Sequence, residues 1–243
     1  MSTIVSSSKS YSPIDSVISD GLLHEFLFDG NLSDSCNNIV TIDPDNKGFT
    51  GAGLTYGVES PIGNYVFEPL SAANTAIFAF TSSYTFGTNT PFSTSCWVKM
   101  PTTNKKDVSQ VIYINQYDNN VFKVFQSYYS KGVNGLMTTP NTYMFGFMNG
   151  SYTYTLMPYK AGMDFGWHHF VMTYNGSNVA KTYIDGELLY TGTATQSGTS
   201  GSKICLFGEN YSPSHGSIYV SLLRIFSKAL TDAEVTLLYN EVM

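Results

Sequence analysis

Charged side chains are scarce in this 243-residue sequence: Asp, Glu, Lys and Arg make up 12% of it, against roughly a quarter in average globular proteins. The formal net charge is −6, and no basic cluster is larger than Lys105-Lys106, so the sequence lacks the electrostatic signature of a nucleic-acid-binding protein. Ser, Thr, Asn, Gly and Tyr must then cover much of the surface. Such a surface suits close packing against other proteins or hydrogen bonding to sugars, although an all-β composition accounts for it equally well.

Long apolar runs and a disulfide framework are also lacking. No stretch of 18 or more apolar residues occurs, so no membrane span is predicted. Residues 1–20 lack the apolar core of a secretory signal, and we expect synthesis in the cytoplasm without a classical signal peptide. Cys36, Cys96 and Cys205 are too few and oddly numbered for a disulfide framework. We interpret them as buried free thiols of a protein that folds in a reducing compartment.

Alternating apolar and polar residues are abundant, and they predict a β protein. From Trp167 to Gly192 the pattern predicts three strands joined by tight turns at Asn175–Asn178 and Asp185-Gly186. In the first of these strands, Phe170, Met172 and Tyr174 lie on the face opposite to Trp167, His169, Val171 and Thr173. Further strands are predicted at residues 22–28, 77–84, 92–100, 108–115, 121–127, 143–148, 151–158, 203–208 and 217–226.

Four segments carry a family resemblance, and they occur in the family's order. Leu23–Asp34, Phe92–Lys99, Trp167–Gly192 and Ser221–Thr231 resemble the opening, central and closing motifs of laminin-G-like (concanavalin A-like) jelly-roll domains. The resemblance implies an all-β, two-sheet antiparallel jelly-roll sandwich. A capping box at Thr231-Asp232-Ala233-Glu234 adds a short C-terminal helix that ends near Asn240.

An enzyme is not predicted, although related jelly rolls include glycosidases. Retaining glycosidases need two carboxylates about 5 Å apart, and the E-x-D-x-x-E strand motif of laminarinase-like enzymes is missing. Asp185 and Glu187 flank a turn glycine, while Asp232 and Glu234 fit the start of the helix. Neither a G-x-S-x-G elbow nor a P-loop occurs.

Metal sites are predicted only in the opening loop. Laminin-G-like domains often bind calcium there, and Asp29, Asn31 and Asp34 match those positions, so Ca²⁺ is a candidate ligand. Ser221 and Leu222 stand where the family places acids in its closing strand, which removes charge from the candidate site. The alternative is that the Asp and Asn side chains only stabilise turns.

A zinc site is not expected from the histidines. His168 and His169 are adjacent, so they point to opposite faces of their strand. We expect one of them to pack in the core beside Trp167 and the other to form hydrogen bonds at the surface. His24 and His215 are isolated in the sequence.

Tyrosine and asparagine gather in the middle third of the chain, where they favour contact with a glycan or a protein partner. The candidates lie in predicted loops: Tyr117, Tyr128, Tyr129, Asn119 and Asn120.

We divide the chain into a polar arm, residues 1–21, and one jelly-roll domain, residues 22–243. The arm is interpreted either as a disordered leader or as an anchor. We predict a non-catalytic recognition or structural module, displayed on a virion as a capsid decoration, fibre or tail component, that contacts neighbouring subunits or host glycans and is oligomeric on a larger assembly. The alternatives are a carbohydrate-binding lectin, assisted by calcium, and a glycoside hydrolase.

Overall fold

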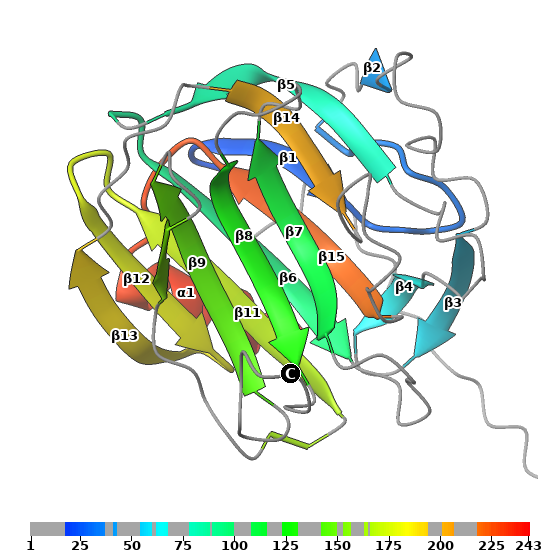
Figure 1. The fold of residues 1–243 in the computed structure, drawn as a ribbon. Coiled ribbons are helices and arrows are strands. Elements are labelled where there is room, and N and C mark those ends of the chain that lie inside the picture. The colour runs from blue at the N-terminus through cyan, green and yellow to red at the C-terminus, as the bar shows by residue number, and fades with distance from the viewer. Residues whose placement is uncertain are drawn as a thin grey trace, which may run out of the picture.

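The computed structural model describes residues 18–36, 41–42, 54–59, 62–67, 78–87, 89–99, 108–115, 123–130, 142–149, 153–156, 163–164, 166–193, 201–206 and 218–243. These residues form two antiparallel sheets stacked face to face, and Figure 1 shows the seven-stranded sheet in front of the eight-stranded one. The predicted all-β jelly-roll sandwich is thereby confirmed. No helix in this part of the chain has the length and apolarity needed to cross a membrane.

The eight-stranded sheet holds the motifs of the family resemblance. Its order is β13 (Glu187–Thr193), β12 (Val179–Ile184), β11 (Trp167–Tyr174), β6 (Phe92–Lys99), β15 (Tyr219–Phe226), β4 (Gly63–Phe67) and β3 (Thr55–Glu59), with β1 (Leu22–Phe26) also paired to β15. Each of these pairs is antiparallel, which places segments far apart in the sequence side by side.

The seven-stranded sheet has the order β10 (Thr153–Leu156), β9 (Thr142–Asn149), β8 (Lys123–Ser130), β7 (Val108–Asn115), β14 (Gly201–Leu206), β5 (Phe78–Phe86) and β2 (Thr41–Ile42). This sheet corrects one prediction. We predicted Tyr128 and Tyr129 in a loop, but they lie in β8, where they pair with Met144 and Tyr143 of β9. The predicted loop positions Tyr117, Asn119 and Asn120 lie outside the described residues.

The core between the sheets follows the alternation of β11. The alternation had placed Phe170, Met172 and Tyr174 on one face, and these residues are buried in the main core, while Val171 faces the outer side of the sheet. The two turns also form as predicted. The Asn175 side chain accepts hydrogen bonds from the backbone of Ser177 and Val179, and Asp185 and Gly186 have positive φ angles of 54° and 78°.

The C-terminal helix α1 (Asp232–Asn240) covers the outer face of the eight-stranded sheet, behind it in Figure 1. Its capping box forms: the Thr231 hydroxyl accepts from the Glu234 backbone, and the Glu234 carboxylate accepts from the Thr231 backbone. Val235 and Leu238 are its buried residues. They pack with the outward side chains of β11 and β12, so the helix hides apolar surface that the sheet would otherwise expose to water.

A buried arginine fixes the end of this helix. Arg224 of β15 is 2% exposed, and its Nε donates to Glu25 of β1 at 2.7 Å. Its two terminal nitrogens donate to the carboxylate of Glu241, at the C-cap of α1, at 2.7 and 3.0 Å. A buried guanidinium needs such partners because its charge is costly outside water. The three side chains therefore join β1, β15 and α1.

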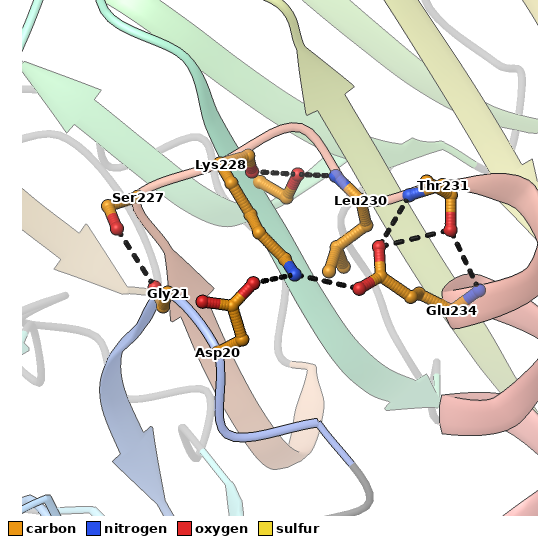
Figure 2. A network of polar contacts seen from close by, with 8 residues as sticks. Asp20, Gly21, Ser227, Lys228, Leu230, Thr231 and Glu234 are labelled. Carbon is orange, nitrogen blue, oxygen red and sulfur yellow. Dashed lines mark hydrogen bonds and ion pairs between the residues drawn. The ribbon is translucent and has the colours of Figure 1, made fainter.

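The packed domain begins before the predicted boundary at residue 22. Ile18 is buried with Leu230 and Val235. Figure 2 shows Lys228 between the carboxylates of Asp20 and Glu234, at 2.6 and 2.7 Å. The described residues that we had assigned to the arm, 18–21, thus pack on the sandwich; residues 1–17 lie outside the described part.

Smaller corrections concern β1 and the cysteines. We predicted the first strand to end at residue 28, but β1 ends at Phe26, because Phe28 adopts a positive φ of 55° that interrupts the strand. Cys96 is free and buried, as predicted, whereas Cys36 is free but only partly buried. The side chain of Cys205 lies outside the part of the chain that the structure describes.

Candidate functional site

In the predicted calcium loop, the carboxylate of Asp34 binds the side chain of His24. Both oxygens of Asp34 are engaged: Oδ2 accepts from His24 Nδ1 at 2.6 Å, and Oδ1 accepts from the backbone of Glu25 and Cys36 at 3.0 Å. Burial raises the pKa of Asp34, but the His24 ring and the two amides outweigh it, so the pKa lies below 3.8. His24, which is isolated in the sequence, therefore has a partner in the fold.

Asp29 and Asn31 stabilise a turn, as in the alternative interpretation. The Asn31 amide donates to Asp29 at 2.7 Å and accepts from the Ser33 backbone at 2.7 Å. These two side chains are exposed, whereas Asp34 is buried. Calcium needs six to eight oxygens around one point. The residues present do not fit it, and in the described part of the chain no three His, Cys, Asp or Glu side chains form a metal site.

The two closing-strand positions also serve the fold. The Ser221 hydroxyl donates to the backbone carbonyl of Asn64. Leu222 is buried with a positive φ of 46° at a register shift between Ser221 and Arg224. The shift is a bulge that turns the apolar Leu222 side chain towards Trp97 and away from solvent.

A Ser–His–Asp arrangement results from the His24 contact. His24 Nε2 lies 2.7 Å from the Ser82 hydroxyl, while Nδ1 faces Asp34. These are the roles of a hydrolytic triad. His24 and Ser82 are, however, only 1% and 4% exposed, against the core phenylalanines Phe26 and Phe80. The Ser82 oxygen also accepts from the Tyr84 backbone. We therefore assign the arrangement to the fold, where it joins β1 to β5.

The adjacent histidines divide between the two environments that we expected. His169 is buried, stacks on Trp97 at 5.2 Å, and lies 2.9 Å from the Ser95 hydroxyl. The core partner is Trp97, where we had predicted Trp167. His168 lies nearer the surface, between Asp185 at 2.9 Å and Asp164 at 3.1 Å. Burial lowers the pKa of His168, but the two carboxylates outweigh it and raise it above 6.5.

Asp185 of the predicted Asp-Gly turn has a second function. One of its oxygens accepts from the His169 backbone at 2.9 Å, and the other faces His168. The turn between β12 and β13 is thereby attached to the start of β11, which fixes the position of Trp167 at the first residue of that strand.

A cluster of partly exposed aromatic side chains lies beside Trp167, on the outer face of the eight-stranded sheet. Trp167 of β11 and Tyr219 of β15 both pair with Lys99 of β6, so the three residues form one row across three strands. Tyr65 of β4 and Glu59 of β3 complete the group. All five side chains are partly exposed. We call these five residues the aromatic patch.

Contacts within the aromatic patch hold it in one geometry. The ring of Tyr65 lies 5.8 Å from Trp167 and 5.3 Å from Tyr219. The Lys99 ammonium lies 5.8 Å from the Trp167 ring and 5.5 Å from the Tyr219 ring, which are cation–π distances. It also binds both oxygens of Glu59, at 2.7 and 2.8 Å. Burial, which is the largest effect, raises the pKa of Tyr219, so its hydroxyl stays protonated.

A glycine next to the aromatic patch makes room for Tyr65. Gly57 pairs with Tyr65 across β3 and β4, and a Cβ on Gly57 would collide with the Tyr65 ring. Such a ring protects the exposed backbone of a glycine near a sheet edge. Beneath the patch, Trp97, Leu222 and Val242 form a buried cluster against which Tyr65 and Trp167 pack. The aromatic patch is thus an open extension of a packed layer.

Sequence reasoning missed the aromatic patch. The period of two had placed Trp167 on the face opposite to Phe170, and Lys99 follows Trp97 by two residues on the same face. That signal identifies two of the five members. Tyr65, Glu59 and Tyr219 come from strands whose neighbours no local pattern specifies.

Comparisons with known proteins agree with this architecture. A family model described as the concanavalin A-like lectin/glucanases superfamily matches residues 72–236. No curated protein sequence matches the chain. Among solved structures, the binding domain of botulinum neurotoxin serotype G has a TM-score of 0.67 and 14% identity, covering 90% of this chain and 51% of that chain.

Two further structures are similar to the same extent. The serotype D ligand-binding domain, in complex with N-acetylneuraminic acid, has a TM-score of 0.65 and 15% identity, with 91% of this chain and 51% of that chain covered. The botulinum neurotoxin DC binding domain, in complex with rat synaptotagmin II, has a TM-score of 0.66 and 14% identity, with 92% and 52% covered. This chain spans about half the length of these structures, and identities this low show a shared fold alone. The family model, in contrast, matches more than half of the sequence, and the chain therefore belongs to the concanavalin A-like lectin/glucanases superfamily.

Proposed function

We propose that this protein is a non-catalytic recognition module that contacts a glycan or a neighbouring protein. The aromatic patch carries this proposal, because it exposes parts of three aromatic rings and one charged pair on a rigid sheet face. Tyrosine and tryptophan supply large contact areas at a low entropic cost, and they are enriched where proteins bind partners.

Structurally similar domains support a recognition function. One was solved with N-acetylneuraminic acid and another with synaptotagmin II, so the same architecture accommodates both a sugar and a protein ligand. At this level of identity the ligands themselves do not transfer to this chain. The shared fold therefore favours binding over other functions.

The placement of the carboxylates also favours binding over glycoside hydrolysis. A retaining mechanism needs two carboxyl groups on either side of an open substrate groove. In the described part of the chain, Glu25 and Glu241 pair with Arg224, and Asp34 pairs with His24. Asp232 accepts from Lys181. These acids therefore serve the fold and are not arranged as a catalytic pair.

A virion component is the more specific form of the proposal. Its support is the low content of charged residues and the polar N-terminal arm, which would dock to the particle while the sandwich faces outward. Because Ile18 is buried and Asp20 binds Lys228, the test requires a deletion of residues 1–17 that leaves these contacts intact. We expect the truncated protein to fold and to lose docking to the assembled particle. Docking at full strength would contradict the proposed role of the arm.

The experiment that tests recognition is a glycan array on the full-length chain, run with calcium and with a chelator. We expect binding that the chelator leaves unchanged, since both Asp34 oxygens are already engaged. Loss of binding on chelation would favour the calcium-assisted lectin instead. No glycan binding in either condition, together with no binding to neighbouring subunits in a pull-down from purified particles, would contradict the recognition function.

A further inference from the structure

The aromatic patch has the chemistry of a sugar-binding surface. An aromatic ring carries negative charge on its faces, and the axial C–H groups of a pyranose ring carry a partial positive charge, so the two stack. Sugar hydroxyls need donors and acceptors beside that stack. Lys99 supplies ammonium donors with 25% of its side chain exposed, and Glu59 supplies carboxylate acceptors with 39% exposed.

We infer that the aromatic patch is a glycan-binding site that stacks a neutral pyranose ring on Trp167, contacts Tyr219, whose ring lies edge-to-face with Trp167 at 6.2 Å, and binds the sugar hydroxyls through Lys99 and Glu59. The inference rests on the proposed recognition function. It adds the class of ligand and the residues that bind it.

The charge of the aromatic patch indicates a neutral sugar. The Lys99 ammonium binds both oxygens of Glu59, so the pair carries no net charge. An anionic sugar would be attracted by Lys99 and repelled by Glu59 at nearly the same distance, so the two effects would largely cancel. A neutral ring meets neither effect, and its hydroxyls can bind to both members of the pair.

The dimensions also agree. Adjacent strands lie about 4.8 Å apart, so the backbone row of Trp167, Lys99 and Tyr219 extends over roughly 10 Å. The rings of Trp167 and Tyr219 converge above it to 6.2 Å between their centroids, which leaves a surface for one pyranose ring. The row is fixed by backbone pairing on both sides of Lys99, and side chains held by a sheet lose little freedom on binding.

The chain offers an unusually clean test, because Trp97 and Trp167 are its two tryptophans. A ¹⁵N-labelled full-length sample should show two indole signals. We would titrate it with cellopentaose, maltopentaose, laminaripentaose, mannopentaose, lactose and sialyllactose. We expect at least one neutral sugar to shift the Trp167 indole signal, because a sugar stacked on this ring changes the environment of its buried Nε1. The change at Trp97, which is 2% exposed, should be smaller.

Variants then separate binding from folding. Trp167→Ala and Tyr219→Leu should each weaken binding of the neutral sugar by tenfold or more, while Tyr190→Ala, at a half-buried tyrosine of β13, should leave it unchanged. Glu59→Gln leaves Lys99 without its counter-charge. This variant should raise the affinity for sialyllactose relative to lactose by several fold, an effect that a purely structural role of Glu59 would not produce.

The outcomes distinguish this inference from the proposed function. A sugar that binds the full chain without shifting the Trp167 indole, and with equal affinity for Trp167→Ala, would place the site elsewhere and overturn the inference while recognition stands. Binding to a neighbouring subunit with no response to any sugar of the panel would have the same meaning. Failure of both sugar and protein binding would overturn the recognition function as well.

Discussion

The buried imidazole of His169 predicts that the fold loses stability in mild acid. The side chain is 2% exposed and stacks on Trp97 at 5.2 Å and on Tyr239 at 6.1 Å. Burial, with a smaller effect of the positive charge on Arg224, lowers the pKa of His169 from 6.5 to about 3, although Asp185 opposes the shift. The ring therefore stays neutral in the folded protein at pH values where it is protonated in the unfolded chain.

The sign and size follow from proton linkage. Below pH 6.5 the unfolded chain binds a proton that folded His169 does not, so the free energy of unfolding falls by about 1.4 kcal/mol per pH unit. Between pH 7 and pH 4.5 the loss is roughly 2–3 kcal/mol, a large part of the 5–15 kcal/mol typical of a domain.

Other groups titrate differently in this window. The pKa of His168 is raised, so its contribution is complete below pH 6.5 and is lost at higher pH. The pKa of Asp34 is lowered, so its contribution persists down to about pH 3.8. Burial raises the pKa of Glu25, despite the opposing effect of Arg224, so the contribution of Glu25 to the stability of the fold increases as the pH falls. A variant is needed to isolate the contribution of His169.

Urea unfolding of the wild type and His169→Phe, each at pH 7.0 and pH 4.5, provides the assay. Phenylalanine retains the ring that stacks on Trp97 but cannot be protonated. It will lower stability at both pH values, because the Ser95 hydroxyl loses its partner. The wild type should lose roughly 2–3 kcal/mol more than the variant on acidification. Equal losses would refute the argument that buried, neutral His169 controls acid stability.

Three further outcomes are expected. Arg224→Met should cost about 3–5 kcal/mol of unfolding free energy, since it leaves Glu25 and Glu241 buried without their cation; thermal unfolding measures it, and a change below about 1 kcal/mol would contradict the assignment. Gly186→Ala should cost roughly 1–2 kcal/mol in urea unfolding, because Gly186 has a φ of +78°; an unchanged midpoint would count against a rigid turn. A fluorophosphonate probe should leave Ser82, which is 4% exposed, unlabelled; stoichiometric labelling lost in Ser82→Ala would reveal a hydrolytic site.

Local patterns were sufficient to predict the strands and turns. The alternation through β11 predicted which residues share a face, because side chains of a strand alternate whatever the strand pairs with. The turn at Asp185-Gly186 and the capping box at Thr231 could also be predicted, since each depends on contacts between residues two to four positions apart. The motifs in their order then indicated the sandwich, and the family match confirms it.

The candidate site was predicted poorly. Asp29, Asn31 and Asp34 matched a calcium motif, but the motif records only residue types along the chain. It could not reveal that Asp34 faces His24, ten residues earlier, on the opposite side of a turn. His24 in turn contacts Ser82, which is 58 residues away. A carboxylate that binds a buried imidazole is unavailable to a metal, and only the folded chain determines which partner it meets.

Tertiary structure alone also creates the aromatic patch. Trp167, Lys99 and Tyr219 become neighbours because β11 and β15 both pair with β6, and the register of each pair depends on how the two sheets bury their apolar faces together. The sequence by itself determined which residues form strands and which faces are apolar, because those properties depend on adjacent residues. Which strands meet, and hence which surface side chains converge, was decided by packing over the whole chain.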